Sequence, residues 1–155
     1  MNTLLTSQNP IAKCCLATRV LIYLGLLCFV VSLFQTVLFT SGDDIQGYWV
    51  FILGWMGIVI FQLSWFANPL NLLALLLLLK RPRLSFLLSI LAFVLASQTL
   101  SFSEIPIGLH ANKIYIKELG LGFYFWYLSQ GLILLSICIE LVLKINQRPL
   151  LNYRH

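Results

Sequence analysis

The stretch that decides the fold covers residues 20–42 and reads VLIYLGLLCFVVSLFQTVLFTSG. It contains 23 consecutive residues without a charge, between Arg19 and Asp43. A bilayer core about 30 Å thick needs roughly 20 apolar residues in a helix. A helix is required because lipid offers backbone groups no hydrogen-bond partner. This stretch therefore predicts a membrane-spanning helix, which we place at about 19–40.

Three further charge-free stretches follow the first. They contain 35, 20 and 21 residues and cover 45–79, 84–103 and 119–139. Of the 155 residues, 60% are hydrophobic and 10% are charged, whereas soluble domains have roughly 25% charged residues. A soluble fold of this size could not bury so much apolar surface. We therefore predict an all-α bundle of four membrane spans that forms a single membrane domain (1–155), and we exclude a soluble enzyme.

The second charge-free stretch is too long for one straight crossing and too short for two. Its 35 residues would make a helix of about 52 Å, while two crossings need roughly 40 residues and a turn. Pro69 lies inside the stretch and has no N–H for the carbonyl of Trp65. We predict one long helix over about 49–79, kinked near Asn68-Pro69, with a re-entrant segment as the alternative. The other two spans are predicted at about 84–103 and 122–143.

The basic residues indicate how the chain is oriented. With four spans, eight of the ten Lys and Arg residues lie on one side, in the two termini and the loop 80–83. The other side, with the predicted loops 41–48 and 104–121, holds only Lys113 and Lys117. Short loops rich in Lys and Arg stay in the cytoplasm, so both termini are predicted to be cytoplasmic. The compact chain with short loops favours a bacterial inner membrane. The net charge of +5 is therefore a topology signal and not a nucleic-acid patch.

Each predicted span carries a stripe of small and polar residues at alternating steps of three and four. In lipid, such residues let helix backbones approach and form hydrogen bonds between helices. The average period near 3.5 predicts a left-handed bundle. We interpret the stripes as packing seams, with the lining of a pore or substrate cavity as the alternative. In chain order, the stripes are Thr18, Leu21, Gly25, Cys28, Ser32 and Gln35; Gly47, Val50, Gly54, Gly57, Phe61, Ser64, Asn68 and Asn71; Ser85, Ser89, Ala92, Ala96, Thr99 and Ser103; and Gly122, Trp126, Ser129, Ile133, Ser136 and Glu140.

Six polar residues are candidates for polar packing or ligand contacts. Asn68 and Asn71 lie beside the predicted kink, where an amide can satisfy the freed carbonyl or a neighbouring helix. A ligand or partner contact at a broken helix is the alternative for this pair. Glu140 precedes Lys144 by four positions, the favoured order for an ion pair, with a buried coupling carboxylate as its alternative. The other three candidates are Gln62, Ser129 and Ser136.

The sequence predicts no catalytic, cofactor or metal site. Both histidines, His110 and His155, lie outside the predicted spans, and the four cysteines form no pair in an external loop. Phosphate-binding and nucleophile motifs are absent from the sequence. The loop 104–121 is predicted to cap the bundle, although residues 113–117 alternate like a short strand.

These observations favour a membrane protein that acts by association, as an accessory subunit or a homo-oligomer, without catalytic activity. Its expected partners are the lipid bilayer and either a second copy or another membrane protein, with no nucleic acid. Two other functions stay open. A ring of copies could form a channel or a membrane-permeabilising effector, and a small-solute transporter could couple to Glu140.

Overall fold

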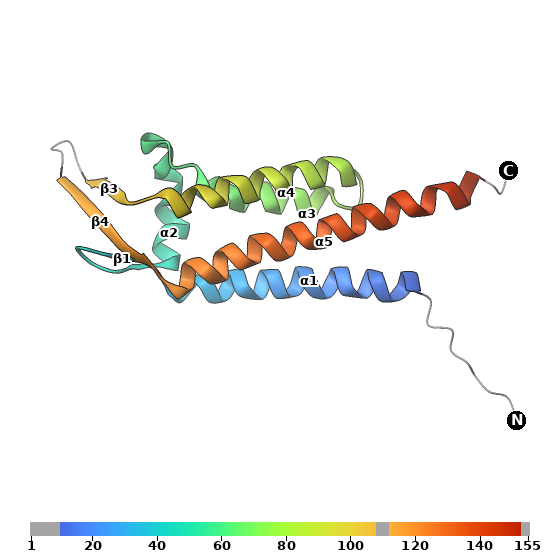
Figure 1. Cartoon of the computed structure of the whole chain (residues 1–155), viewed down its shortest axis with the longest axis horizontal. Helices are drawn as coiled ribbons and strands as arrows, with labels where there is room; N and C mark the ends of the chain where they lie inside the picture. The colour runs from blue at the N-terminus through green and yellow to red at the C-terminus, as the bar shows by residue number, and fades with distance from the viewer. Residues whose placement is uncertain (1–9, 108–111, 153–155) are drawn as a thin grey trace, which may run out of the picture.

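Three long helices dominate the computed structural model, which describes residues 10–107 and 112–152 (Figure 1). Each of them contains a stretch that is long and apolar enough to cross a membrane, at Leu16–Leu33, Pro82–Ser101 and Leu121–Ile145. The chain is therefore mostly helical, with three candidate membrane spans. The three helices are α1 (Pro10–Leu33), α4 (Pro82–Ser97), which the short 3-10 helix η3 (Gln98–Ser101) continues, and α5 (Leu121–Asn152).

The second charge-free stretch does not form the single helix expected over 49–79. It is interrupted at Phe61, whose φ of 56° lies in the left-handed region. The segment before this residue crosses the end of the bundle, whereas the segment after it runs along the bundle beside α4 (Figure 1). The first segment comprises α2 (Gly47–Leu53) and the 3-10 helix η1 (Gly54–Ile60), and the second comprises the 3-10 helix η2 (Ser64–Phe66) and α3 (Ala67–Leu77).

Gln98 provides the hydrogen bonds that the interrupted helix lacks. Its Nε2 donates to the carbonyl oxygen of Phe61 at 2.7 Å, and its Oε1 accepts the N–H of Leu63 at 2.8 Å. An unpaired backbone group in an apolar environment costs several kcal/mol, and these two bonds supply partners for one C=O and one N–H group at the break. One side chain from η3 therefore makes the break possible.

Pro69 does not kink the interior of a helix, so the expected cause of the bend is wrong. The residue lies in the first turn of α3. The first N–H groups of any helix have no carbonyl within the helix to meet, so a proline costs no hydrogen bond there. The chain changes direction before the proline, at 61–63, and not at Asn68-Pro69.

A small sheet replaces most of the loops expected beyond one end of the helices. The first helix ends at Leu33 and not near residue 40, because the residues that follow favour a strand through their β-branched and aromatic side chains. The sheet is antiparallel with the order β2-β1-β4-β3, so the all-α class is wrong for this end. The alternation at 113–117 does mark a strand, as expected. The strands are β1 (Thr36–Thr40), β2 (Ile45–Gln46), β3 (Glu104–Ile107) and β4 (Asn112–Leu119).

The helix α5 lies at the centre of the arrangement. It packs along α1 on one side and against α4 on the other, while α3 packs mainly on α4 (Figure 1). Small residues of the first, third and fourth predicted stripes are buried at these contacts, as expected for packing seams. The second stripe differs, because Gly54, Gly57 and Ser64 line a cavity and Phe61 is 81% exposed. The buried members are Thr18, Gly25 and Ser32 of α1; Gly47 of α2; Asn71 of α3; Ser85, Ser89, Ala92 and Ala96 of α4; Thr99 of η3; and Gly122, Ser129, Ile133 and Ser136 of α5.

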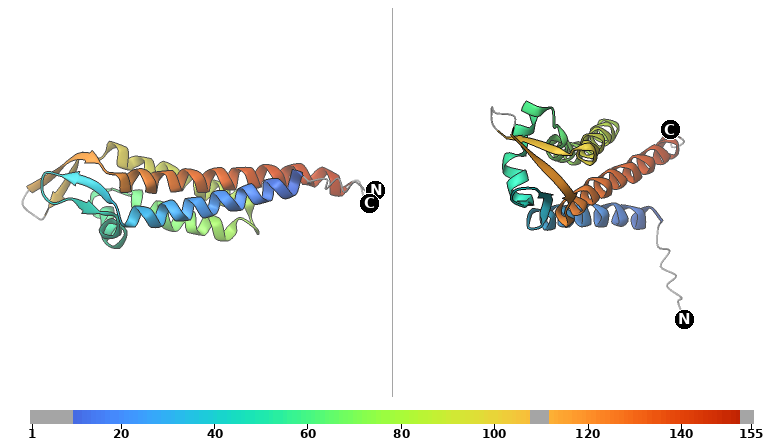
Figure 2. Two further views of the ribbon diagram at one scale, coloured as in Figure 1. Left: turned by 90° about the horizontal axis from the view of Figure 1, so that it is seen from below. Right: turned by 60° about the vertical axis from the view of Figure 1, so that its left-hand side comes forward.

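The two ends of the molecule differ in charge and in structure. The start of α1, the turn between α3 and α4, and the end of α5 lie at one end, and the sheet lies at the other (Figure 1 and Figure 2). At the first end, Lys144 Nζ donates to the carbonyl oxygens of Leu78 at 3.0 Å and Leu79 at 3.3 Å. A cation at the carboxyl end of a helix satisfies carbonyls that have no partner within the helix. Lys144 therefore ties α5 to the end of α3.

Gly47 offers a test of the contact between α1 and the start of α2. A Cβ added at Gly47 would lie 2.0 Å from the carbonyl oxygen of Ser32, so Gly47→Ala forces the backbone apart. We expect a loss of roughly 1–3 kcal/mol, seen as a lower Tm of the protein in detergent. The matched control is Gly131→Ala, whose Cβ would meet only Phe93 Cε2 at 3.7 Å. An unchanged Tm for Gly47→Ala would contradict this packing.

Candidate functional site: a polar network beside two apolar cavities

Asn71 is the centre of a buried polar network that joins three helices. Its Nδ2 donates to Oε1 of Gln130 on α5, and its Oδ1 accepts a hydrogen bond from Ser89 Oγ on α4 at 2.9 Å. All three side chains are at most 3% exposed. Because hydrocarbon offers no alternative partner, such groups must satisfy one another. The network therefore fixes α3, α4 and α5 relative to one another.

Asn68 lies one helical turn before Asn71 and also contacts α5. Its Oδ1 accepts a hydrogen bond from Trp126 Nε1 at 2.8 Å, and Gln130 Nε2 lies 3.5 Å from the same oxygen. Both asparagines therefore contact a neighbouring helix, as expected. Asn68 accepts from α5, whereas Asn71 donates to Gln130 of α5 and accepts from Ser89 of α4. Ser32 of α1 donates to the carbonyl of Phe29 in its own helix.

The two serine candidates of α5 serve packing. Ser129 and Ser136 are fully buried, and their hydroxyls donate to the carbonyls of Trp126 and Ile133 three residues earlier, each at 2.8 Å. A hydroxyl bonded back to its own helix presents little more than a small surface to its neighbours. These residues allow close approach of helices and offer a ligand no free donor.

Glu140 lies far from the asparagines, at the basic end of the bundle. Its Oε1 is 3.7 Å from Lys144 Nζ, in the i, i+4 arrangement expected from the sequence. The same ammonium group donates to the carbonyls that follow α3. The carboxylate of Glu140 therefore belongs to the contact that joins α5 to the end of α3.

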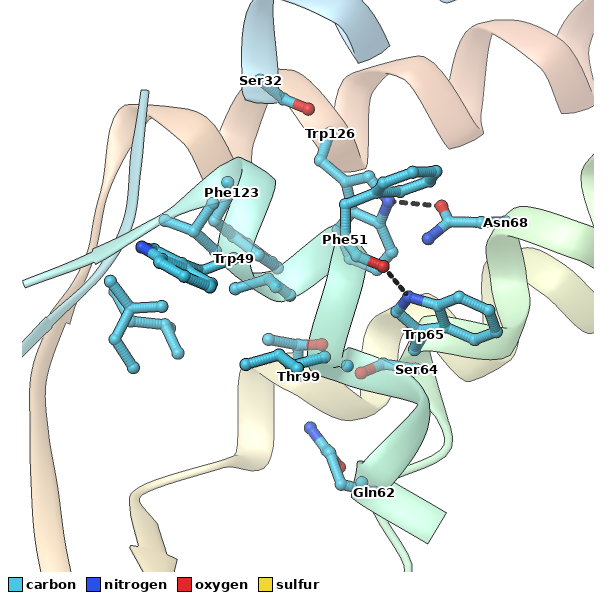
Figure 3. Close-up of a pocket in the computed structure, with 18 of the residues that line it drawn as sticks. Ser32, Trp49, Phe51, Gln62, Ser64, Trp65, Asn68, Thr99, Phe123 and Trp126 are labelled. Carbon is cyan, nitrogen blue, oxygen red and sulfur yellow. Dashed lines mark hydrogen bonds between the residues drawn. The ribbon is translucent and has the colours of Figure 1, made fainter. Parts of the chain in front are cut away.

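Two apolar cavities adjoin the network. The larger, of about 770 Å³, lies between the sheet-bearing end of the bundle and the crossing segment α2–η1 (Figure 3). The smaller, of about 320 Å³, lies between α1 and α3 above α5. Gln62, the remaining candidate, lines the larger one. Four residues line both: Phe29, Phe51, Trp65 and Asn68.

Aromatic side chains form much of the wall of the larger cavity. Trp65 Nε1 donates to the carbonyl of Phe51 at 2.9 Å, which connects η2 to α2 across the cavity. Trp126 holds Asn68 at the floor (Figure 3). The sequence placed Trp126 in the stripe of the fourth predicted span, and no local pattern relates Trp65 to Phe51. Gln130 was also missed, although a glutamine within a charge-free stretch is itself a signal.

The described residues contain no cluster of side chains that could bind a metal ion. No three His, Cys, Asp or Glu side chains in that part of the chain come together. Cys28 and Cys138 are free and half-buried. His110 and His155 lie outside the described residues.

Comparisons with known proteins identify no relative of this chain. No family model, curated protein or solved structure matches this chain. The chemistry at the two cavities is defined by their own linings, which consist of aromatic and aliphatic surfaces with a few amides and hydroxyls. These groups bind through apolar contact and hydrogen bonds.

The buried network predicts non-additive substitutions. Asn71→Leu leaves the Gln130 amide and the Ser89 hydroxyl without their partner, at a cost of roughly 1–3 kcal/mol for a buried polar group. Adding Gln130→Leu removes one stranded group, so the double variant should lose less than the sum of the single losses. Unfolding of the detergent-solubilised protein measures this coupling. Gln62→Leu, whose side chain has no hydrogen bond within the described part, is the control, and additive losses would contradict the network.

Proposed function

We propose that this chain is a multi-pass membrane protein that acts by association with another membrane-embedded helix, without a catalytic step of its own. The partner helix comes from a second copy or from another protein, so the chain works as a homo-oligomer or an accessory subunit. The observation that carries the proposal is the open cleft between α1 and α3 that contains the smaller cavity.

The cleft exists because α1 and α3 pack on different partners, α5 and α4. Leu26 of α1 is 42% exposed on one wall, and Leu72 of α3 is 61% exposed on the other. The floor is formed by Ser129 and Ile133 of α5, which are buried. In lipid, helices associate through van der Waals packing on small residues. A concave apolar surface above a small residue offers such packing to a further helix.

The membrane arrangement that we propose has four crossings, with both termini in the cytoplasm of a bacterial cell and a left-handed twist. Support comes from the placement of the helix ends, because Lys80, Arg81 and Arg83 lie at the end where α1 begins and α5 finishes (Figure 1). Positive residues favour the cytoplasmic side. The helix α3 is short for a crossing, with 11 residues against roughly 20. The apolar segment α2–η1 then lies at the outer surface of the membrane.

The alternatives have less support. A channel needs polar side chains that face a water-filled path, whereas Asn71 is bonded to Gln130 and Asn68 to Trp126 within one copy. A transporter coupled to Glu140 needs an available carboxylate, whereas this one pairs with Lys144.

The topology is tested by reporter fusions in a bacterial host. Fusions after Lys80 and after Lys117 should report opposite sides, with Lys80 cytoplasmic, because the turn after α3 and the strand β4 lie at opposite ends of the bundle. The measurement is the ratio of a periplasm-active to a cytoplasm-active reporter. A periplasmic Lys80 together with a cytoplasmic Lys117 would overturn the four-crossing arrangement and favour a re-entrant second stretch.

The partner is tested by photo-crosslinking in native membranes. A photoreactive amino acid at Leu72 lies in the cleft, and the same residue at Leu87 of α4 is the matched control, because these leucines are 61% and 62% exposed and Leu87 lines neither cavity. We expect protein adducts at position 72 and only lipid adducts at position 87. Mass spectrometry distinguishes a second copy from another protein. Lipid adducts alone at both positions would overturn the association.

A further inference from the structure

We infer that the larger cavity binds one neutral lipid whose head group presents a carbonyl oxygen. Isoprenoid quinones and acylglycerols both have this chemistry. The inference goes beyond the association proposed above, because the head group occupies the larger cavity, called the chamber below, and only the tail reaches the cleft between α1 and α3. It is tested on the purified chain without a partner.

The size and wall of the chamber suit a ring or a small head group. Its volume of about 770 Å³ lies within the roughly 300–1,000 Å³ typical of small-molecule sites. Three of the four tryptophans, Trp49, Trp65 and Trp126, line it together with Phe51 and Phe123 (Figure 3). Flat aromatic surfaces favour stacking on a planar group.

The lining excludes a charged head group. None of the residues that line the chamber is Asp, Glu, Lys, Arg or His. Moving an unpaired phosphate from water into such a site costs far more than apolar contact returns. The polar groups that do line it are neutral, namely the side chains of Ser32, Gln62, Ser64, Asn68 and Thr99. The ligand is therefore neutral as well.

Asn68 defines the polar contact. Trp126 Nε1 is a donor only, so the oxygen of the Asn68 amide must face it. The Nδ2 group then faces away from Trp126, and it has no hydrogen-bond partner within the described part of the chain. Figure 3 shows this amide at the edge of the chamber, beside Phe51 and Trp65. Asn68 is half-buried, and its two N–H groups are available to an acceptor such as a carbonyl oxygen.

The route for a hydrocarbon tail starts at the same residue. Asn68 lines both cavities, together with Phe29, Phe51 and Trp65. The smaller cavity opens between α1 and α3, where exposed leucines face the surrounding lipid. A head group on Asn68 therefore leaves an apolar path for a prenyl or acyl tail toward the bilayer.

Native mass spectrometry of the full chain in detergent tests this site. The probes are a decyl-substituted benzoquinone, dioctanoylglycerol and dioctanoylphosphatidylglycerol, each titrated separately. We expect a saturable 1:1 complex with at least one of the two neutral carbonyl lipids, bound at least 10-fold more tightly than the anionic lipid. Preference between the quinone and the acylglycerol identifies the source of the carbonyl. Binding of neither neutral lipid, or equal binding of all three, would overturn the inference.

A near-isosteric substitution tests the role of Asn68. Asn68→Asp keeps the oxygen that accepts from Trp126 but replaces the two N–H donors with a second oxygen, so binding should weaken 10-fold or more. The matched control is Gln46→Glu, which makes the same change on the sheet, where the amide donates to Thr36 Oγ1. Equal affinities of the two variants would overturn the assigned contact.

A second variant and a fluorescence measurement test the binding site without Asn68→Asp. If Asn68→Asp does not fold, Ser64→Phe fills part of the chamber from η2 and leaves Asn68 in place, and affinity equal to the unsubstituted chain would overturn the site. In a Trp55→Phe background, every remaining tryptophan lines the chamber. A bound quinone should then quench their fluorescence with saturation, whereas quenching that only follows the quinone content of the micelle contradicts binding there.

Discussion

Hydrogen bonding of the backbone at Phe61–Leu63 is the constraint on which the rest of the structure depends. A chain in lipid cannot leave a helix unless other groups satisfy its N–H and C=O groups. The amide of Gln98 bonds to the carbonyl of Phe61 and to the N–H of Leu63, so the second apolar stretch can turn there. The turn places α2 and η1 across the bundle end, where they form one wall of the larger cavity. It also starts α3 early enough for Pro69 to fall in its first turn.

Charge-free stretches and small-residue stripes predicted much of the helical part, because both patterns depend on sequence spacing alone. The stripes at Thr18, Gly25 and Ser32, and at Ser85, Ser89 and Ala92, are buried as the period near 3.5 requires. The Glu140–Lys144 pair also follows from spacing along one helix. Such features are local, since a helix places residues three, four and seven apart on one face without help from the rest of the fold.

Features that depend on distant partners could not be predicted in this way. Gln98 lies 37 residues from Phe61, and Trp126 lies 58 residues from Asn68, so no spacing rule connects them. The same holds for the sheet, where β1 pairs with β4 across most of the chain. A run such as Thr36–Thr40 is apolar enough to continue a span, and its β-branched and aromatic side chains favour a strand without indicating which strand it pairs with.

The polar groups near the two cavities differ in how completely the chain itself satisfies them. Asn71, Ser89 and Gln130 satisfy one another where α3, α4 and α5 meet, and Asn71 and Gln130 also line the smaller cavity. Asn68 lies one turn nearer the break, and α5 satisfies only its oxygen. The two amide hydrogens of Asn68 therefore remain available at the junction of the two cavities, where the surrounding surface is apolar and aromatic. An apolar surface with a few placed polar groups is typical of a site that binds a small molecule.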